Sequence, residues 1–301
     1  MASDIGSLKI SPEELDLTHT LTPGQSFRWK KDRHDTWTGV VQGRVVQIRR
    51  EGEDIKFKMT PGGPDAELIE DYFRLDVNLR EMYADFLRCD GRLEQAVERF
   101  KGLRILRQEP EETLLSYICS AANSVPRIAA SIEIMARDYG KFIANIDGKD
   151  YFTFPTAESL ASADVEYMTG VCGLGFRCAN LNSVAQQLVD RSVEWLNSLR
   201  QASYEEARAE LLSIRGVGLK IADCVLLFSL DKDEAFPVDT HIRQVATKYY
   251  LPEFKQKTLT PAVYQQIVDY FQSKFGRYAG WAQEYLFYDD LIKRSSKERA
   301  R

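Results

Sequence analysis

The spacing of apolar residues changes once along this chain, and that change limits its possible folds more than any other feature. Residues 8–60 hold short β-branched and aromatic runs separated by a Gln-Gly turn at 42–43 and a Glu-Gly turn at 51–52, a pattern typical of antiparallel strands. After residues 61–73, apolar residues recur at i, i+3 and i+4 in one segment after another, as in amphipathic helices. The sequence therefore predicts an α+β protein, with an N-terminal antiparallel β-sheet domain followed by an all-α body.

The helical pattern divides the second part of the chain into segments without repeats or low-complexity linkers. Helices are predicted over 112–140, 164–170, 179–199, 204–214, 219–230, 240–250, 262–275 and 279–292. We expect a sheet domain over 1–105, a helical domain over 106–292 that contains a helical hairpin at 211–231, and a basic tail over 293–301. The tail is interpreted as a solvated terminus, with a localisation or DNA-binding tail as the alternative.

Composition excludes several classes of protein. No apolar run approaches the roughly 18 residues of a membrane span, and the first residues lack a basic and an apolar signal region, so we expect an intracellular protein that binds no membrane. The five cysteines are odd in number and form no CxxC pair, and the chain has three histidines, which argues against a disulfide framework or a zinc site. The net charge of −5 neither supports nor excludes a nucleic-acid partner, because one basic face is enough to bind a duplex.

Residues 211–240 carry the strongest chemical signal. An apolar helix is predicted to end at Ile214, and a second apolar helix begins near Leu219 after a turn that contains Gly216, Val217 and Gly218. The two glycines leave backbone N–H groups uncovered at a helix N-terminus, which suits an anion such as a DNA phosphate. This pattern predicts a helix-hairpin-helix, a motif that non-catalytic proteins also use to bind the DNA backbone.

Lys220 lies in the first turn of the second helix of this hairpin. The positive end of the helix dipole and burial would both lower the pKa of its amine, as a lysine nucleophile requires. An exposed, phosphate-binding lysine is the alternative interpretation. Cys224 and Phe228 follow at i+4 and i+8 on the same helix face, where they either line a pocket or belong to the core.

Asp239 is predicted to cap the helix that begins after it. A carboxylate held by backbone donors stays ionised, and such a charge near a sugar C1′ atom would stabilise the positive charge that grows as a glycosidic bond breaks. The combination of Gly-Val-Gly-x-Lys and a downstream Pro-Val-Asp is more specific than either motif alone.

At this point the sequence closely resembles the 8-oxoguanine DNA glycosylase/AP lyases of the helix-hairpin-helix superfamily. The resemblance spans roughly residues 15 to 292, and its motifs are PGQSFRW at 23–29, LRILRQEPEETLLSYICSAAN at 103–123, GLGFRC at 173–178, SYEEA at 203–207, GVGLKIADC at 216–224, PVDTHI at 237–242 and GWAQEYLF at 280–287. It implies that Lys220 attacks C1′ and forms a Schiff base, that Asp239 assists base loss, and that the same enzyme then cleaves the strand by β-elimination.

The resemblance also implies a pocket for the extruded base, in line with the need to flip a stacked nucleotide before its glycosidic bond is reached. Gly24 would accept a hydrogen bond from the N7 hydrogen of 8-oxoguanine, which guanine lacks. Gln283 would bind the Watson–Crick edge, Cys224 and Phe287 would sandwich the base, and Pro237 would join the same pocket. Read from the residues alone, Phe287 is a core side chain and Gly24 a turn glycine. Gly216, Val217, Gly218 and His241 would contact the DNA backbone.

The family reads the base opposite the lesion with residues that are partly changed here. Arg127 and Arg177 match the arginines that read an opposite cytosine. Ala122 stands where an asparagine usually fills the gap beside that cytosine, with Asn123 as its possible substitute, and Phe176 replaces a wedging tyrosine. The resemblance implies a preference for cytosine opposite the lesion, and the change at Ala122 leaves its strength open.

The partner implied is double-stranded DNA that contains 8-oxoguanine, bound by a monomer that is DNA-associated in a cytoplasm or nucleoid if prokaryotic and in a nucleus if eukaryotic. No cofactor and no catalytic metal are expected, although the resemblance suggests a cation that bridges hairpin carbonyls and a phosphate. No cysteine follows Cys224, so the four-cysteine iron–sulfur loop of related glycosylases is excluded. The alternatives are a monofunctional alkyl-purine glycosylase, against which Lys220 argues, and a non-catalytic helix-hairpin-helix DNA-binding protein.

Overall fold

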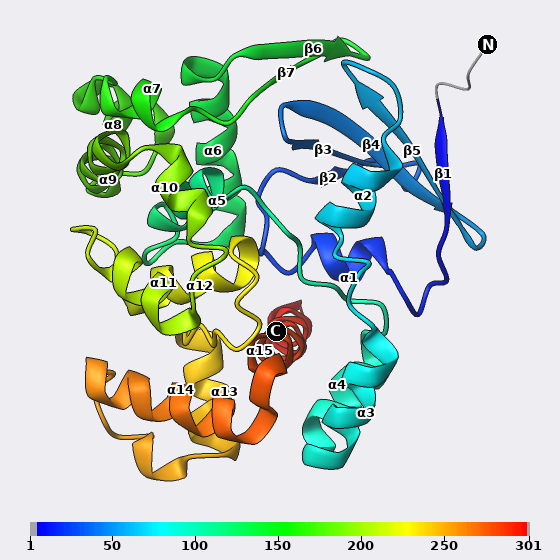
Figure 1. The fold of residues 1–301 in the computed structure, drawn as a ribbon, viewed down its shortest axis with the longest axis vertical. Helices are drawn as coiled ribbons and strands as arrows, with labels where there is room; N and C mark the ends of the chain where they lie inside the picture. The colour runs from blue at the N-terminus through cyan, green and yellow to red at the C-terminus, as the bar shows by residue number, and fades with distance from the viewer. Residues whose placement is uncertain (1–4, 300–301) are drawn as a thin grey trace.

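A five-stranded antiparallel sheet forms the N-terminal part of the protein, whose computed structural model describes residues 5–299. The strands are β1 (Gly6–Lys9), β2 (Lys30–Lys31), β3 (Trp37–Val41), β4 (Arg44–Glu51) and β5 (Asp54–Thr60). Their order in the sheet is β1-β5-β4-β3-β2, and every pair is antiparallel (Figure 1). The predicted antiparallel sheet is therefore confirmed.

Both predicted turns of the sheet are present. Gln42 and Gly43 link β3 to β4 and have φ values of 46° and 71°, the left-handed conformation that two-residue hairpin turns require. Gly52, with a φ of 63°, follows Glu51 and opens the turn from β4 to β5. The left-handed conformation at these turns thus sets the register of the three central strands.

One face of the sheet is buried because its strands alternate apolar and polar residues. Trp37, Ile48 and Phe57 point to this face and pack into a small core. Helices α1 (Leu17–Leu21) and α2 (Ala66–Tyr72) cover it. The predicted strand-like stretch from residue 8 to 60 thus contains one short helix, which begins where Asp16 accepts a hydrogen bond from the His19 amide at 2.7 Å.

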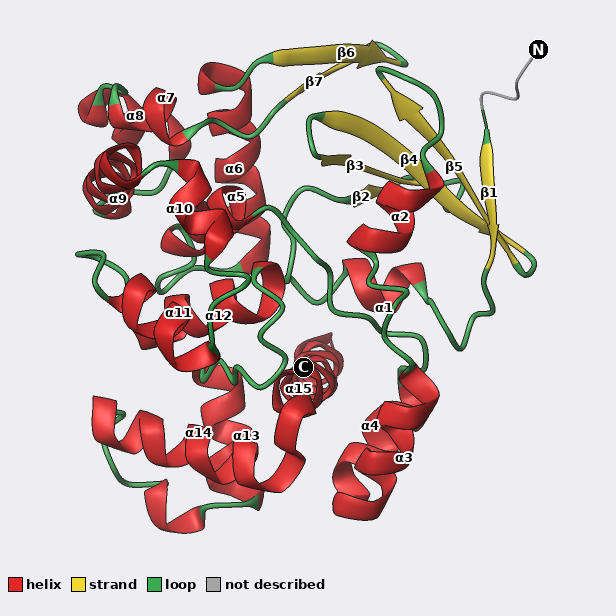
Figure 2. Cartoon of the chain, in the orientation of Figure 1, coloured by secondary structure: helices red, strands yellow, loops and turns green. Residues whose placement is uncertain are grey.

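Helices make up most of the remaining chain (Figure 2). They are α3 (Leu79–Cys89), α4 (Gly91–Arg99), α5 (Pro110–Ile118), α6 (Val125–Tyr139), α7 (Ala157–Ala161), α8 (Val165–Cys172), α9 (Arg177–Arg191), α10 (Val193–Ser198), α11 (Tyr204–Leu212), α12 (Leu219–Ser229), α13 (Thr240–Tyr249), η1 (Pro252–Phe254), α14 (Pro261–Phe275), η2 (Gly276–Tyr278) and α15 (Ala279–Arg299). They share one large hydrophobic core. Within residues 5–299, no helix is long and apolar enough to cross a bilayer.

The helical body departs from the predicted pattern in two places. The single helix predicted over 112–140 is two helices, α5 and α6, separated by residues 119–124. A hairpin of β6 (Phe142–Ile146) and β7 (Lys149–Phe152) follows α6 and contacts β4 of the large sheet. Its turn residues Asp147 and Gly148 have φ values of 52° and 80°, the Asp-Gly conformation that favours a tight hairpin.

Ion pairs join the segment after α12 to the segments that follow α2 and precede α5. Arg107 donates to Asp231 at 2.9 Å and to Asp71 at 2.6 Å, and Arg74 donates to Asp233 at 2.6 Å. Arg74 is itself buried, and a buried guanidinium requires such partners. These contacts fix where the chain leaves α12 on its way to Asp239.

Gly280, in the first turn of α15, allows this helix to approach the segment 233–235 at backbone distance. Its N–H donates to the Asp233 carbonyl at 2.7 Å. A Cβ atom at this position would lie 2.3 Å from Leu227 Cδ1 and 2.5 Å from the Ala235 carbonyl oxygen. The position therefore has no room for a side chain.

We predict that Gly280→Ala destabilises the protein by about 1–3 kcal/mol, because the added methyl group overpacks a rigid contact with backbone atoms. The matched control is Gly170→Ala, inside α8, where an added Cβ meets nothing within 4 Å. That control should be neutral or gain up to about 1 kcal/mol. Chemical denaturation of both variants measures the difference, and an unchanged Gly280→Ala variant would contradict the close approach.

Candidate active site

The turn between α11 and α12 presents free backbone donors to solvent. Gly218 occupies the N-cap position of α12 without a side-chain cap, and both Gly216 and Gly218 are exposed while Val217 is buried. The first N–H groups of a helix have no intrahelical acceptor. The predicted helix-hairpin-helix is present, and its turn has the geometry of an anion site.

Helix α9 holds this turn in place. Gln187 accepts from the Arg215 N–H at 2.9 Å and donates to the Arg215 carbonyl at 3.0 Å. Asn180 donates to the Gly216 carbonyl at 3.2 Å, and a Cβ on Gly216, which has a φ of 102°, would lie 2.1 Å from the Asn180 Oδ1 atom. Only glycine fits this contact. Sequence reasoning missed both α9 residues.

Lys220 lies in the first turn of α12 and is partly buried. Its Nζ atom donates to the Ser120 hydroxyl at 3.0 Å and lies 4.7 Å from the centre of the Tyr117 ring. Among the described side chains, those of residues 5–294, no carboxylate forms an ion pair with it. The amine is thus held by a neutral hydroxyl and an aromatic face.

Cys224 and Phe228 lie along the same helix, as the spacing predicts, and both are buried. Burial raises the pKa of the Cys224 thiol to about 12, so this group is uncharged at neutral pH. The Phe228 ring stacks on Tyr117 with centroids 5.7 Å apart. Phe228 therefore supports the ring beneath Lys220 as part of the core.

Asp239 caps α13, as predicted. Its side chain accepts a hydrogen bond from the Ile242 N–H at 2.8 Å. The preceding Pro237 and Val238 are buried, which anchors the capping residue against the helical body. His241, in the first turn of α13, pairs through Nδ1 with the Asp290 carboxylate at 2.9 Å.

Gly24 lies in a loop that Gln25 fixes to the helical body. The Gln25 amide donates to the Arg104 carbonyl at 2.8 Å and accepts from the Leu106 N–H at 2.8 Å. Gly24 has a φ of 90°, a conformation that glycine adopts readily, and a Cβ there would lie 2.8 Å from Val125 Cγ2. The Tyr117 hydroxyl lies 3.4 Å from the Gly24 carbonyl, so the loop and Lys220 meet at one ring.

Gln283 and Phe287 lie one turn apart on α15. Gln283 is buried, and its Oε1 atom has no hydrogen-bond partner in the described part of the chain. Phe287 contacts the His241 ring edge to face at 5.3 Å. The predicted pocket residues of α15 thus border α13 and its capping residue Asp239.

Arg177 is engaged with the loop after α5. Its guanidinium donates to the carbonyls of Ala121 and Ala122, the latter at 2.8 Å, and lies 4.5 Å from the ring of Phe176, which is 75% exposed. Ala122 has a φ of 49°. The backbone of this loop is therefore held by a residue that was predicted to read the opposite base.

The other two predicted opposite-base residues are placed differently. The Asn123 amide donates to the Cys119 carbonyl at 3.2 Å, and its oxygen accepts from the Ser124 N–H at 3.0 Å. Asn123 is thus used by its own loop. Arg127 is exposed on the first turn of α6.

Comparisons with known proteins agree with this architecture. The family model described as "8-oxoguanine DNA glycosylase, N-terminal domain" matches residues 7–114. The family model described as "HhH-GPD superfamily base excision DNA repair protein" matches residues 115–268. The N-glycosylase/DNA lyase OGG1 of Arabidopsis thaliana is 35% identical over 293 residues, which cover 94% of this chain and 80% of that protein.

Two solved structures share the whole fold. The structure of MBOgg1 in complex with a low-affinity DNA ligand has a TM-score of 0.86 and 32% identity, and covers 97% of both chains. The Clostridium acetobutylicum 8-oxoguanine glycosylase/lyase in complex with double-stranded DNA containing cytosine opposite 8-oxoguanine has a TM-score of 0.85 and 30% identity, and covers 96% of this chain and 98% of that one.

The two family models together cover residues 7–268. The Arabidopsis relative and the two solved structures match between 94% and 97% of this chain. This protein therefore belongs to the 8-oxoguanine DNA glycosylase family, within the HhH-GPD superfamily of base excision DNA repair proteins.

Proposed function

We propose that this protein removes 8-oxoguanine from double-stranded DNA and then cleaves the strand at the emptied sugar, as a bifunctional DNA glycosylase and AP lyase. The observation that carries the proposal is the position of Lys220, on the hairpin helix that begins at an uncapped anion site and without an ion-pair partner among the described side chains of residues 5–294. Relatives named N-glycosylase/DNA lyase support both activities.

The reaction begins with the neutral Lys220 amine, because only its free electron pair can attack C1′. A bond forms from Nζ to C1′ as the bond from C1′ to the base breaks, and the base leaves with the electron pair and takes up a proton. The Asp239 carboxylate would stabilise the positive charge that develops on the sugar in this step.

Strand cleavage follows from the same covalent bond. The attack leaves two protons on Nζ, and one of them passes to the ring oxygen as the bond from C1′ to O4′ breaks, which yields a protonated Schiff base between Nζ and C1′. Removal of a hydrogen from C2′ then expels the 3′ phosphate by β-elimination, and water releases Lys220. No group beyond the amine and general bases is required for this sequence.

Selection of the lesion would come from the loop of Gly24 and from α15. The Gly24 carbonyl would accept the N7 hydrogen of 8-oxoguanine, whereas the N7 lone pair of guanine would face that oxygen and be repelled. A site built for a hydrogen-bond donor rejects an analogue without it. The unpartnered Oε1 atom of Gln283 suits the donors of the Watson–Crick edge, and Cys224 and Phe287 would flank the base, with Pro237 beside them.

Binding of DNA would use the hairpin turn and the loops around it. Gly216, Val217, Gly218 and His241 would contact the strand that carries the lesion, and one monomer is sufficient for this arrangement. We further propose that residues 1–105 and 106–292 act as the sheet and helical domains of this enzyme, with residues 293–301 as a basic tail. The part of this tail that the structure describes, up to Arg299, belongs to α15.

We predict that Lys220→Gln abolishes covalent trapping by borohydride on a duplex with one 8-oxoguanine, and slows base release by at least about 10²-fold. The reason is that an amide cannot form the Schiff base. Lys58→Gln, at an exposed position of β5, is the matched control and should trap normally. Base release that persists in Lys220→Gln would point to a monofunctional glycosylase, and no release by either protein would point to a DNA-binding protein without catalysis.

We predict that Ala122→Asn raises the preference for cytosine opposite the lesion about fivefold, because one added hydrogen bond contributes about 1 kcal/mol. Asparagine also tolerates the φ of 49° that alanine adopts here. Single-turnover excision opposite each of the four bases measures the change. Ala121→Asn, at the neighbouring exposed position, is the control, and equal effects of both variants would contradict a specific role of position 122.

A further inference from the structure

Two buried oxygen atoms on α15 lack hydrogen-bond partners, and only one of them is explained by the proposed function. Gln283 and Glu284 are 4% and 2% exposed, and the Oε1 atom of each has no partner in the described residues. Buried polar atoms without partners are rare and call for an explanation. Gln283 is assigned to the base, whereas Glu284 has no assigned role.

The packing of α15 directs Glu284 toward the segment that ends at Asp239. Gly280, four residues earlier on the same helix face, packs on Asp233 and Ala235. Phe287, three residues later, contacts His241. Glu284 lies between these two contacts on α15, and the Asp239 charge acts on its carboxyl group.

Among the described residues, the titratable groups that interact electrostatically with Glu284 include a carboxylate, a thiol and several phenols. They are Asp239 at the start of α13, Tyr117 on α5, Cys224 on α12, and Tyr285 and Tyr288 on α15 itself. Burial and, to a smaller extent, the Asp239 charge together raise the pKa of the Glu284 carboxyl group to about 8. A buried carboxylate without a cation or a donor is strongly disfavoured, so Glu284 carries its proton at neutral pH.

We propose that Glu284 is a positioning residue for the glycosylase reaction: an uncharged acid behind Asp239 that leaves the active site with a single carboxylate charge. This inference rests on the proposed function, since it concerns the charge that the Lys220 amine experiences. Lys220 shares Tyr117 and Cys224 as neighbours with Glu284. A second negative charge in this enclosed site would favour the protonated amine, which is not a nucleophile.

The first test compares single-turnover release of 8-oxoguanine by the wild-type protein and by Glu284→Gln between pH 6.5 and pH 9.5. Glutamine imitates the uncharged acid at every pH, whereas about nine-tenths of wild-type Glu284 is ionised one pH unit above a pKa of about 8. The ratio of the variant's rate to the wild-type rate should therefore rise about tenfold between pH 7 and pH 9. A ratio that stays constant with pH would overturn the proposal.

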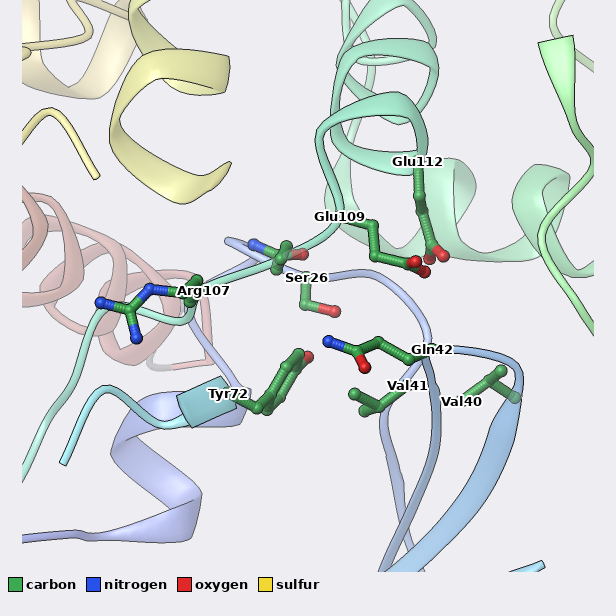
Figure 3. A pocket seen from close by; sticks show the side chains of 9 residues that line it. Ser26, Val40, Val41, Gln42, Tyr72, Arg107, Glu109 and Glu112 are labelled. Atoms are coloured by element: carbon green, nitrogen blue, oxygen red, sulfur yellow. The ribbon is translucent and has the colours of Figure 1, made fainter. Parts of the chain in front are cut away.

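The matched control is Glu112→Gln on α5. Burial also raises the pKa of this carboxyl group, to about 7, but the charges that act on it are those of Arg28, Glu109 and Glu133. It lines a separate cavity of about 20 Å³, in which its carboxylate lies beside that of Glu109, near Ser26 and Gln42 (Figure 3). The rate ratio for this variant should not rise above pH 8.

A second measurement reports the proton on Glu284 without any activity. In the unfolded chain the carboxyl group ionises near its ordinary pKa of 4.5, and in the folded protein at about 8. The stability that is fully present below pH 4.5 is therefore lost as the pH rises toward 8. The melting temperature of Glu284→Gln should therefore rise relative to that of the wild-type protein between pH 4.5 and about 8. Above that pH the difference should stay constant.

The outcomes separate this inference from the proposed function. A wild-type protein that releases no base at pH 7 would contradict the proposed function, while the melting comparison would still show whether Glu284 is protonated. An active protein with a constant rate ratio would contradict only the role of Glu284. A melting difference that does not change with pH would show an ionised Glu284 and overturn the proposal directly.

Discussion

The ring of Tyr117 is the contact on which the candidate active site depends. It lies beneath the Lys220 amine at 4.7 Å, stacks on Phe228 at 5.7 Å and places its hydroxyl 3.4 Å from the Gly24 carbonyl. One buried side chain thus sets the distance between the nucleophile and the loop that would identify the lesion. Burial also keeps this phenol uncharged, since it raises the Tyr117 pKa well above its ordinary value. The distance from the Lys220 amine to the ring centre is that of a cation–π contact.

Local patterns in the sequence predicted those features that depend on neighbouring residues. The turns at Gly43 and Gly52, the glycine-rich hairpin turn and the cap at Asp239 are all formed as expected. Two local signals were overlooked. Pro126 lies in the first turn of α6, a position where proline favours the start of a helix, and Asp147-Gly148 marks the turn of the β6–β7 hairpin.

The contacts that complete the site could not be predicted, because they join residues far apart in the chain. Ser120 is one hundred positions from Lys220, and Gln187 reaches the hairpin turn from another helix. Asparagines and glutamines form similar hydrogen bonds on many surfaces, so their identity alone does not reveal a partner. For the same reason, the sequence alone does not show that Glu284 is buried, because its burial depends on how α15 packs.

The short loop after α5, residues 119–124, contacts both Lys220 and Arg177. At one end, the Ser120 hydroxyl holds the amine of Lys220, and at the other, Arg177 grips the carbonyls of Ala121 and Ala122. Three of the five N–H groups of Arg177 donate to carbonyls, those of Ala121, Ala122 and Leu174. The loop of residues 119–124 therefore contacts Arg177 at one point and the Lys220 amine at another, so a change in its backbone would displace both side chains together.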